Sequence, residues 1–184
     1  MWTAEREIGR ARAAELIAAA APQLAAVPVD PFGRGHPASR RAHTRAVLQS
    51  LVDSAVWAGD PAVDALLDRA AALAEPDGST VVVHGELHVR HLLVDPEGRA
   101  SGVIDWGDVC LADPAVDLSF GFAAFPGPAR AAFLSAYGPV DPERELRARA
   151  FAVRLAALLT SYAAAHHRAS LLTESLASLS RAVR

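Results

Sequence analysis

The residues whose types could support chemistry are concentrated between positions 84 and 108. Glu86 follows one apolar run, His91 begins a second, and Asp105 ends a third. Two carboxylates and an imidazole brought together in this way could hold a metal ion and a phosphate group. The sequence therefore predicts a single site built from these three residues.

Short strands must position these residues. The apolar runs 81–83, 91–94 and 102–104 are bounded by polar residues, and Asp95-Pro96-Glu97-Gly98 separates the last two. Apolar runs of this length joined by a Pro/Gly turn are typical of a β-hairpin. Because the two ends of a hairpin lie close together, we expect the hairpin to bring the three site residues to one place.

The rest of the chain is predicted to be helical. Asp-Pro pairs at positions 60, 113 and 141 each combine a capping acceptor with a proline suited to the first helical position. The expected helices span 3–26, 38–58, 61–75, 114–122, 128–136, 142–168 and 170–183. With 184 residues, of which 52% are hydrophobic and many are alanine, the chain is expected to form one mostly helical α+β domain over residues 1–184.

Composition excludes several classes of protein. A net charge of −3 gives no indication of binding to nucleic acid or to an anionic membrane. The single cysteine, Cys110, rules out an internal disulfide framework and is interpreted as a small buried hydrophobe. Because neither a signal peptide nor a long apolar span is present, the expected location is the cytoplasm.

Residues 79–120 resemble the catalytic core of the aminoglycoside phosphotransferase and choline kinase-like family, distant relatives of protein kinases. That family reads HGDxxxxN, then a hairpin, then [IV]D[WF]. The corresponding residues here are His84-Gly85-Glu86, His91 and Ile104-Asp105-Trp106, and the segment from Ala112 to Leu118 is also similar. The resemblance implies a protein-kinase-like C-terminal lobe with a catalytic-loop hairpin packed among helices.

The resemblance also implies roles for individual residues. In protein kinases an Asp accepts the proton of the substrate hydroxyl, and a downstream Asn and a further Asp hold magnesium. Carried over, Glu86 is the catalytic residue, Asp105 and His91 are metal ligands, and ATP with Mg²⁺ phosphorylates a small molecule. Sugars, amino alcohols and macrolides all remain open as acceptors. Structural support of the motif is assigned to His84, Gly85, His88, Trp106, Asp108 and Asp117, with His88 interpreted as a hydrogen-bonded loop histidine.

Two substitutions within the motif alter its chemistry. Glu86 is one methylene longer than the family Asp, and a displacement of about 1 Å at a reacting group can lower a rate roughly a hundredfold. His91 replaces an amide oxygen with an imidazole nitrogen, although magnesium prefers oxygen ligands. We therefore expect activity below that of the family.

A nucleotide-covering N-terminal lobe cannot be recognised. All 18 basic residues are arginine. The segment 32–37, Phe-Gly-Arg-Gly-His-Pro, is predicted to be an ordinary loop, because it lacks the flanking strand of a phosphate-binding loop. The chain is expected to correspond to a truncated C-terminal lobe. A separate N-lobe or a homodimer would then cover the exposed cleft face. An exposed apolar patch near Trp106 or Leu87 would favour such pairing. In the alternative, the chain is an inactive or repurposed binding module.

A zinc hydrolase is a further alternative. His84, His88 and His91 are spaced by four and three residues, which would align them on one helical face where zinc could bind. However, the neighbouring apolar runs favour strands, and Glu86 falls two residues after His84, whereas HExxH requires one. Phosphotransfer is therefore the preferred hypothesis.

Overall fold

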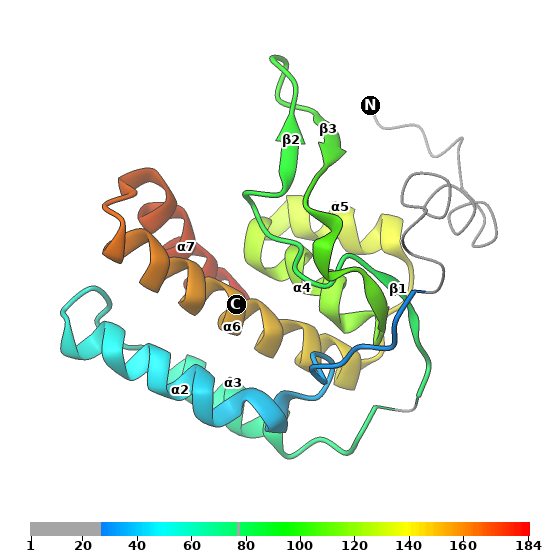
Figure 1. The fold of residues 1–184 in the computed structure, drawn as a ribbon, viewed down its shortest axis with the longest axis horizontal. Coiled ribbons are helices and arrows are strands. Elements are labelled where there is room, and N and C mark those ends of the chain that lie inside the picture. Colours follow the sequence, from blue (N-terminus) through cyan, green and yellow to red (C-terminus); the bar gives the residue numbers. More distant parts are fainter. Residues whose placement is uncertain (1–26, 77) are drawn as a thin grey trace.

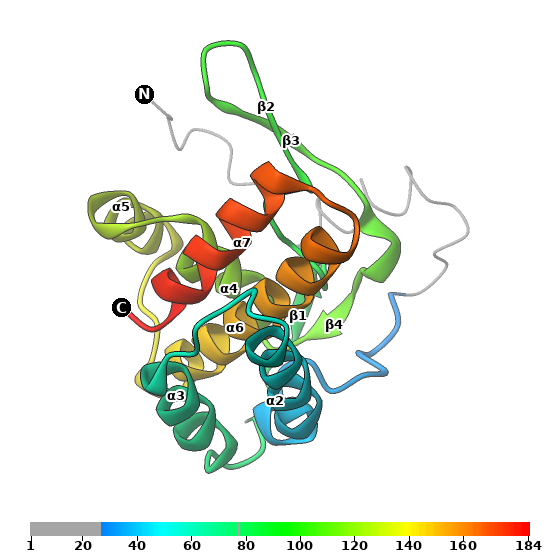
Figure 2. The same cartoon turned by 90° about the vertical axis from the view of Figure 1, so that its left-hand side faces the viewer.

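The computed structural model describes residues 27–76 and 78–184, which form a helical body and a projecting hairpin (Figures 1 and 2). The helices are α2 (Pro37–Asp53), α3 (Pro61–Ala71), α4 (Ala115–Ala124), α5 (Gly127–Tyr137), α6 (Pro142–Ala165) and α7 (Ala169–Ala182). The strands are β1 (Val81–Val83), β2 (Leu92–Val94), β3 (Ala100–Val103) and β4 (Cys110–Ala112), with the short 3-10 helix η1 (Trp106–Asp108) between β3 and β4. The mostly helical α+β class is confirmed, whereas the helix expected over 3–26 lies outside the described residues.

Helix α6 is the central element of the body. It contacts α2, α3, α4 and α7, and Figure 2 shows α7 on one side of it and α2 and α3 on the other. Its buried residues include Ala148, Ala152, Ala156 and Ala157, whose small side chains let the neighbouring helices approach closely. None of the described helices is long and apolar enough to cross a membrane.

A two-stranded antiparallel sheet connects the site to this body. In it β1 pairs with β4, so that Val83 lies opposite Cys110, and both side chains are buried. They pack with Phe151 and Leu155 of α6. On the other edge of β4, the N–H of Asp30 donates to the carbonyl of Leu111 (2.9 Å). The sequence did not predict β4, because its partner is distant along the chain, but the interpretation of Cys110 as a buried hydrophobe is confirmed.

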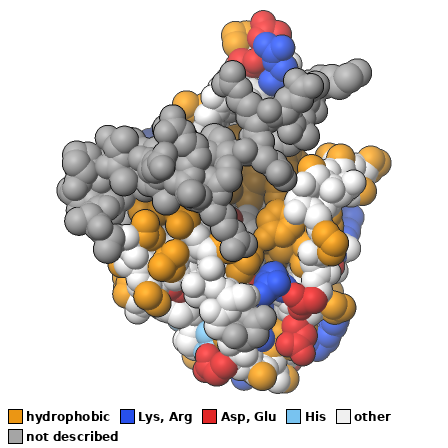
Figure 3. Space-filling view, turned by 90° about the vertical axis from the view of Figure 1, so that its right-hand side faces the viewer, with side chains coloured by type: hydrophobic (Ala, Val, Ile, Leu, Met, Phe, Trp, Pro, Cys, Tyr) orange, Lys and Arg blue, Asp and Glu red, His pale blue; other side chains and the backbone are white. Residues whose placement is uncertain are grey.

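The predicted hairpin is confirmed as the antiparallel pair of β2 and β3, with an irregularity in register between Leu93 and Val94. It extends away from the helices (Figure 1), so the expectation that it packs among them is wrong. Leu93 and Val94 are 45% and 56% exposed and therefore contribute little burial energy. Figure 3 shows charged side chains together at the top of the molecule, where the hairpin tip lies.

The observed starts of the helices agree with the predicted starts better than the observed ends agree with the predicted ends. The carboxylates of Asp60 and Asp141 accept backbone hydrogen bonds and cap α3 and α6 as predicted. By contrast, α2 ends at 53 instead of 58, α3 at 71 instead of 75, and α6 at 165 instead of 168. Beyond α2 and α6, Ala55 and His167 adopt left-handed conformations (φ 54° and 53°) that cannot continue a helix.

Candidate functional site

The loop 84–91, which joins β1 to β2, is held in place by a carboxylate from another element. Asp117, in the first turn of α4, accepts hydrogen bonds from the backbone N–H groups of His84 (2.6 Å) and Gly85 (3.2 Å). Burial raises the pKa of Asp117, and the two N–H donors oppose that rise. Helix α4 therefore fixes where the loop begins.

Gly85 brings this loop into direct contact with η1. Its φ is +89°, and a Cβ atom placed there would lie 2.3 Å from the carbonyl oxygen of Asp108. An L side chain would have to overcome both the backbone conformation and this overlap. The position therefore requires glycine, and the close approach joins the two polar segments of the motif.

The ring of His84 joins the same segments through hydrogen bonds. Its Nε2 lies 2.8 Å from the carbonyl oxygen of Ile104, and its Nδ1 accepts from the N–H of Glu86 (3.3 Å). Because a carbonyl oxygen only accepts, the ring proton is on Nε2. The buried His84 thus positions the backbone of Glu86 relative to Ile104, the residue before Asp105.

Glu86, His91 and Asp105 converge as the sequence predicted. Nδ1 of His91 donates to the carbonyl of Glu86 (2.9 Å), and Nε2 of the same ring lies 3.4 Å from Oδ2 of Asp105. Asp105 has a left-handed backbone (φ 66°), uncommon for a residue other than glycine, and its side chain is 67% exposed. The left-handed backbone of Asp105 thus directs its largely hydrated carboxylate to the edge of the site.

Glu86 lies in the wall between two cavities. One, of about 280 Å³, is also lined by His91, Asp105 and residues of α6. The other, of about 260 Å³, is lined by Gly85, Asp108 and the segment around Arg34. Leu155 and Leu158 of α6 line both. The arrangement places one carboxylate, Glu86, in reach of molecules bound on either side.

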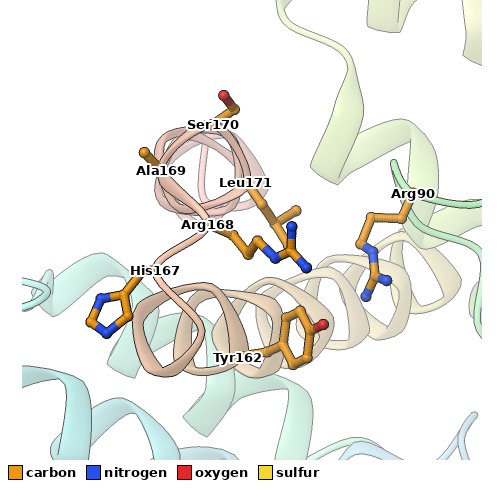
Figure 4. Close-up of a pocket in the computed structure, with 7 residues that line it drawn as sticks. All are labelled: Arg90, Tyr162, His167, Arg168, Ala169, Ser170 and Leu171. Carbon is orange, nitrogen blue, oxygen red and sulfur yellow. The ribbon is translucent and has the colours of Figure 1, made fainter.

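A third cavity, of about 560 Å³, shares Arg90 and Tyr162 with the first. Figure 4 shows the guanidinium groups of Arg90 and Arg168 directed toward the same space beside the ring of Tyr162. The Arg90 guanidinium carbon lies 5.1 Å from the centre of that ring. The sequence did not predict Tyr162 or Arg168 as site residues, because Tyr162 on α6 and Arg168 just before α7 lie outside any motif.

Arg34 attaches the segment before α2 to the site. Its guanidinium pairs with Asp108 of η1 (2.5 Å) and with Asp30 (2.8 Å). The segment 32–37 was predicted to be a loop, and it consists of turns that lead into α2. The ion pair between Arg34 and Asp108 was not predicted from the sequence. The four-residue spacing of Asp30 and Arg34 was only a weak signal for the ion pair between those two residues.

The zinc hypothesis is contradicted by the histidines. Loop 84–91 is not helical, both ring nitrogens of His84 contact backbone groups, and the described residues contain no group of three or more potential ligands suited to a metal. The ring of His88 packs at a tilt against that of His91 (3.8 Å between centroids, 35° between planes). Its Nδ1 is buried and has no hydrogen-bond partner within the described part of the chain, contrary to expectation. Burial, followed by the nearby His91, lowers the pKa of His88 to about 4.

Comparison with known proteins decides the family. The model of the phosphotransferase enzyme family matches residues 3–152. This chain belongs to that family. An uncharacterized protein of Bacillus subtilis (strain 168), YcbJ, is 44% identical over 41 residues, which are 22% of this chain and 13% of that protein.

Two solved phosphotransferase structures are also similar. A macrolide 2′-phosphotransferase type I is 23% identical with a TM-score of 0.49, and the match covers 88% of this chain and 52% of that one. A macrolide 2′-phosphotransferase from Brachybacterium faecium is 28% identical with a TM-score of 0.44, covering 88% and 55%. The chain thus spans about half the length of these solved relatives.

Proposed function

We propose that this chain supplies the catalytic lobe of an ATP- and magnesium-dependent phosphotransferase that acts on a hydroxyl of a small molecule. The observation that carries the proposal is the convergence of Glu86, His91 and Asp105 on one cavity at the base of the hairpin. Membership of the phosphotransferase family gives this constellation its chemical interpretation.

In the proposed reaction the acceptor oxygen bonds to the γ-phosphorus of ATP, and the bond to the departing ADP oxygen breaks. Glu86 orients the acceptor hydroxyl and takes its proton, while His84 holds the Glu86 backbone in place. His91 directs Nε2 into the same space, where a protonated Nε2 would donate a hydrogen bond to a phosphate oxygen.

The donor set fits a magnesium ion that is also held by the nucleotide. Magnesium commonly takes one or two protein carboxylates, with phosphate oxygens and water completing its shell. The exposed carboxylate of Asp105 suits that role, whereas the imidazole of His91 is a poor ligand for this ion. Bound there, the ion would neutralise charge on the transferred phosphoryl group.

Exposed apolar side chains beside Asp105 favour a second function, in which this face binds a partner. Ile104 and Trp106 flank Asp105 and are 44% and 46% exposed. The chain also has no lysine to grip a nucleotide phosphate. We therefore infer that another lobe or a second copy covers this face and completes the nucleotide cleft. If no catalysis survives, the same face would serve as a binding module.

Thermal unfolding with and without excess ATP and magnesium tests the proposal. Saturation at about a hundred times the dissociation constant should raise the melting temperature by about 5–11 °C. Asp105→Ala should remove the magnesium-dependent part of this rise, while Asp53→Ala, an exposed carboxylate on α2, should leave it intact. An unchanged shift in Asp105→Ala would exclude its role as a metal ligand.

The assignment of the two substituted motif positions is tested by restoring the family residues. Glu86→Asp combined with His91→Asn should increase ADP release in a screen of sugars, amino alcohols and macrolides. The shorter carboxylate and the amide oxygen recreate the geometry and ligand type of the motif. No gain with any acceptor, together with no thermal shift by ATP, would favour the partner-binding module.

A further inference from the structure

The cavity on the far side of Glu86 from Asp105 is lined by three arginines, Arg34, Arg40 and Arg154, which we term the arginine cluster. Arg34 and Arg40 come from the segment before α2 and from α2 itself, and Arg154 comes from the middle of α6. All three are partly buried, so water screens their charges less than it would on an open surface.

The three arginines differ in their carboxylate partners, and the carboxylates of Glu86 and Asp108 also line the cavity. Arg34 is paired with carboxylates of Asp30 and Asp108. Arg40 donates to the carbonyl oxygen of Phe32, and Arg154 contacts Nδ1 of His43 (3.1 Å). Within residues 27–76 and 78–184, neither Arg40 nor Arg154 has a carboxylate within 4 Å. Burial, followed by the charges of Arg40 and Arg34, lowers the pKa of Arg154, and the charge of Glu86 opposes this shift.

Arg147 adds an unsatisfied buried donor beside the cluster, although its charge is paired with Glu143 (Nη2 to Oε2, 3.7 Å). Arg147 of α6 is 5% exposed, and its Nη1 has no hydrogen-bond partner among the described groups. It lines a narrow cavity, of about 10 Å³, whose wall also contains the whole arginine cluster. That space is close to the minimum for one water molecule, so a larger ligand would occupy the adjoining 260 Å³ cavity.

We infer that this cavity is an oxyanion subsite that receives a phosphate or carboxylate group of a substrate. Planar guanidinium groups bind both anions through paired hydrogen bonds, and a bound anion would relieve the repulsion within the cluster. This inference rests on the proposed function in one respect: the ligand is called a substrate because the chain is proposed to be a phosphotransferase.

Two different molecules, the acceptor and the nucleotide, could supply the anionic group that the arginines bind. Glu86 separates the arginine cluster from the cavity that contains Asp105, so one hydroxylated acid could present its hydroxyl to Glu86 and its anionic group to the arginines. The terminal phosphates of the nucleotide are the other source. Competition distinguishes them. Inorganic phosphate that still binds when MgATP is saturating assigns the subsite to the acceptor, and displacement by MgATP assigns it to the nucleotide.

Calorimetric titration of inorganic phosphate into the full chain without magnesium tests the subsite. Arg154→Gln should weaken binding about tenfold or more, the loss typical of a hydrogen bond to a charged group, whereas Arg154→Lys should weaken it less. The control is Arg168→Gln in the 560 Å³ cavity, which should leave binding unchanged. Arg40→Gln provides a second cluster variant, and the melting temperature of each variant in phosphate-free buffer reports folding.

The inference is overturned if phosphate does not bind, or if Arg154→Gln and Arg40→Gln bind it as tightly as the native chain. Loss of binding in Arg168→Gln alone would place the anion in the other cavity and overturn it too. Asp105→Ala should retain phosphate binding while losing the magnesium-dependent ATP shift. Failure of the proposed function is therefore distinguishable from failure of the subsite.

Discussion

The loop 84–91 and the β2–β3 hairpin are adjacent in sequence but are stabilised differently. The loop is anchored by contacts with distant segments, including the carboxylate of Asp117 and the backbone of Asp108. The hairpin is stabilised by its own ladder and by ion pairs at its tip, such as Arg99 with Asp95. The candidate catalytic residues therefore depend on the helical body, whereas the hairpin tip is independent of it.

The largest expected difference between the two regions comes from their glycines. Gly85→Ala should lower the free energy of unfolding by roughly 3 kcal/mol or more, because the new Cβ overlaps the Asp108 carbonyl and φ is positive. Gly98→Ala in the hairpin turn also has a positive φ, but no atom lies within 4 Å of its Cβ position. It should cost about 1–2 kcal/mol. Urea unfolding measures both, and equal losses would contradict the anchoring of the loop.

A second pair compares two carboxylates that accept backbone hydrogen bonds. Asp117→Asn weakens the acceptor for two N–H groups of the loop and should cost about 1.5–3 kcal/mol in urea unfolding. Asp95→Asn, at the exposed hairpin turn, should change stability little, since water competes for the Arg99 groups that it binds. A larger loss from the hairpin variant would reverse the comparison.

Mild acid should weaken the loop before the hairpin. The pKa of folded His88 is about 4, below the usual 6.5, so on acidification the unfolded chain takes up a proton that the folded chain excludes. The stability associated with neutral His88 is complete above about pH 6.5 and is lost as the pH falls toward 4. The hairpin's Asp95 has its pKa lowered by hydrogen bonds from Arg99, so its contribution is lost only in stronger acid.

Unfolding in urea at pH 7 and pH 5.5 measures this effect. His88→Gln should reduce the difference in stability between the two pH values, and the exposed His167→Gln should preserve it. The same pH dependence in His88→Gln as in the native chain would show that another group controls the response.

The smallest effect is expected on the hairpin strands. Val94→Thr keeps a β-branched side chain at an exposed position and should change the free energy of unfolding by less than about 0.5 kcal/mol. It should also leave the thermal shift with ATP and magnesium unchanged. A marked loss of either would mean that this face of the hairpin is covered in solution.

Local signals made part of this structure predictable. The turn at 95–98 and the flanking apolar runs identify the hairpin, and with it the convergence of Glu86 and Asp105. The Asp-Pro pairs likewise identify helix starts. Helix ends were less accurate, because Ala55 and His167 do not reveal their left-handed conformations by residue type.

The rest depends on contacts between distant positions. Strand β4 is defined by its pairing with β1 rather than by its own three residues. Arg34 reaches Asp108 across 74 positions, and Arg154 joins the arginine cluster only because α6 packs against α2. No pattern within a short window contains this information, so the cluster could not be predicted from a single sequence.

The position of Asp117 has a consequence for biosynthesis. This anchor lies 33 residues after His84, and α6, which packs against both sheet and helices, ends only at Ala165. A ribosome therefore delivers the loop before either of its supports. Because chain segments emerge at roughly 5–20 residues per second, the loop should remain unformed for several seconds during translation. The candidate site is thus among the last parts of the nascent chain to mature.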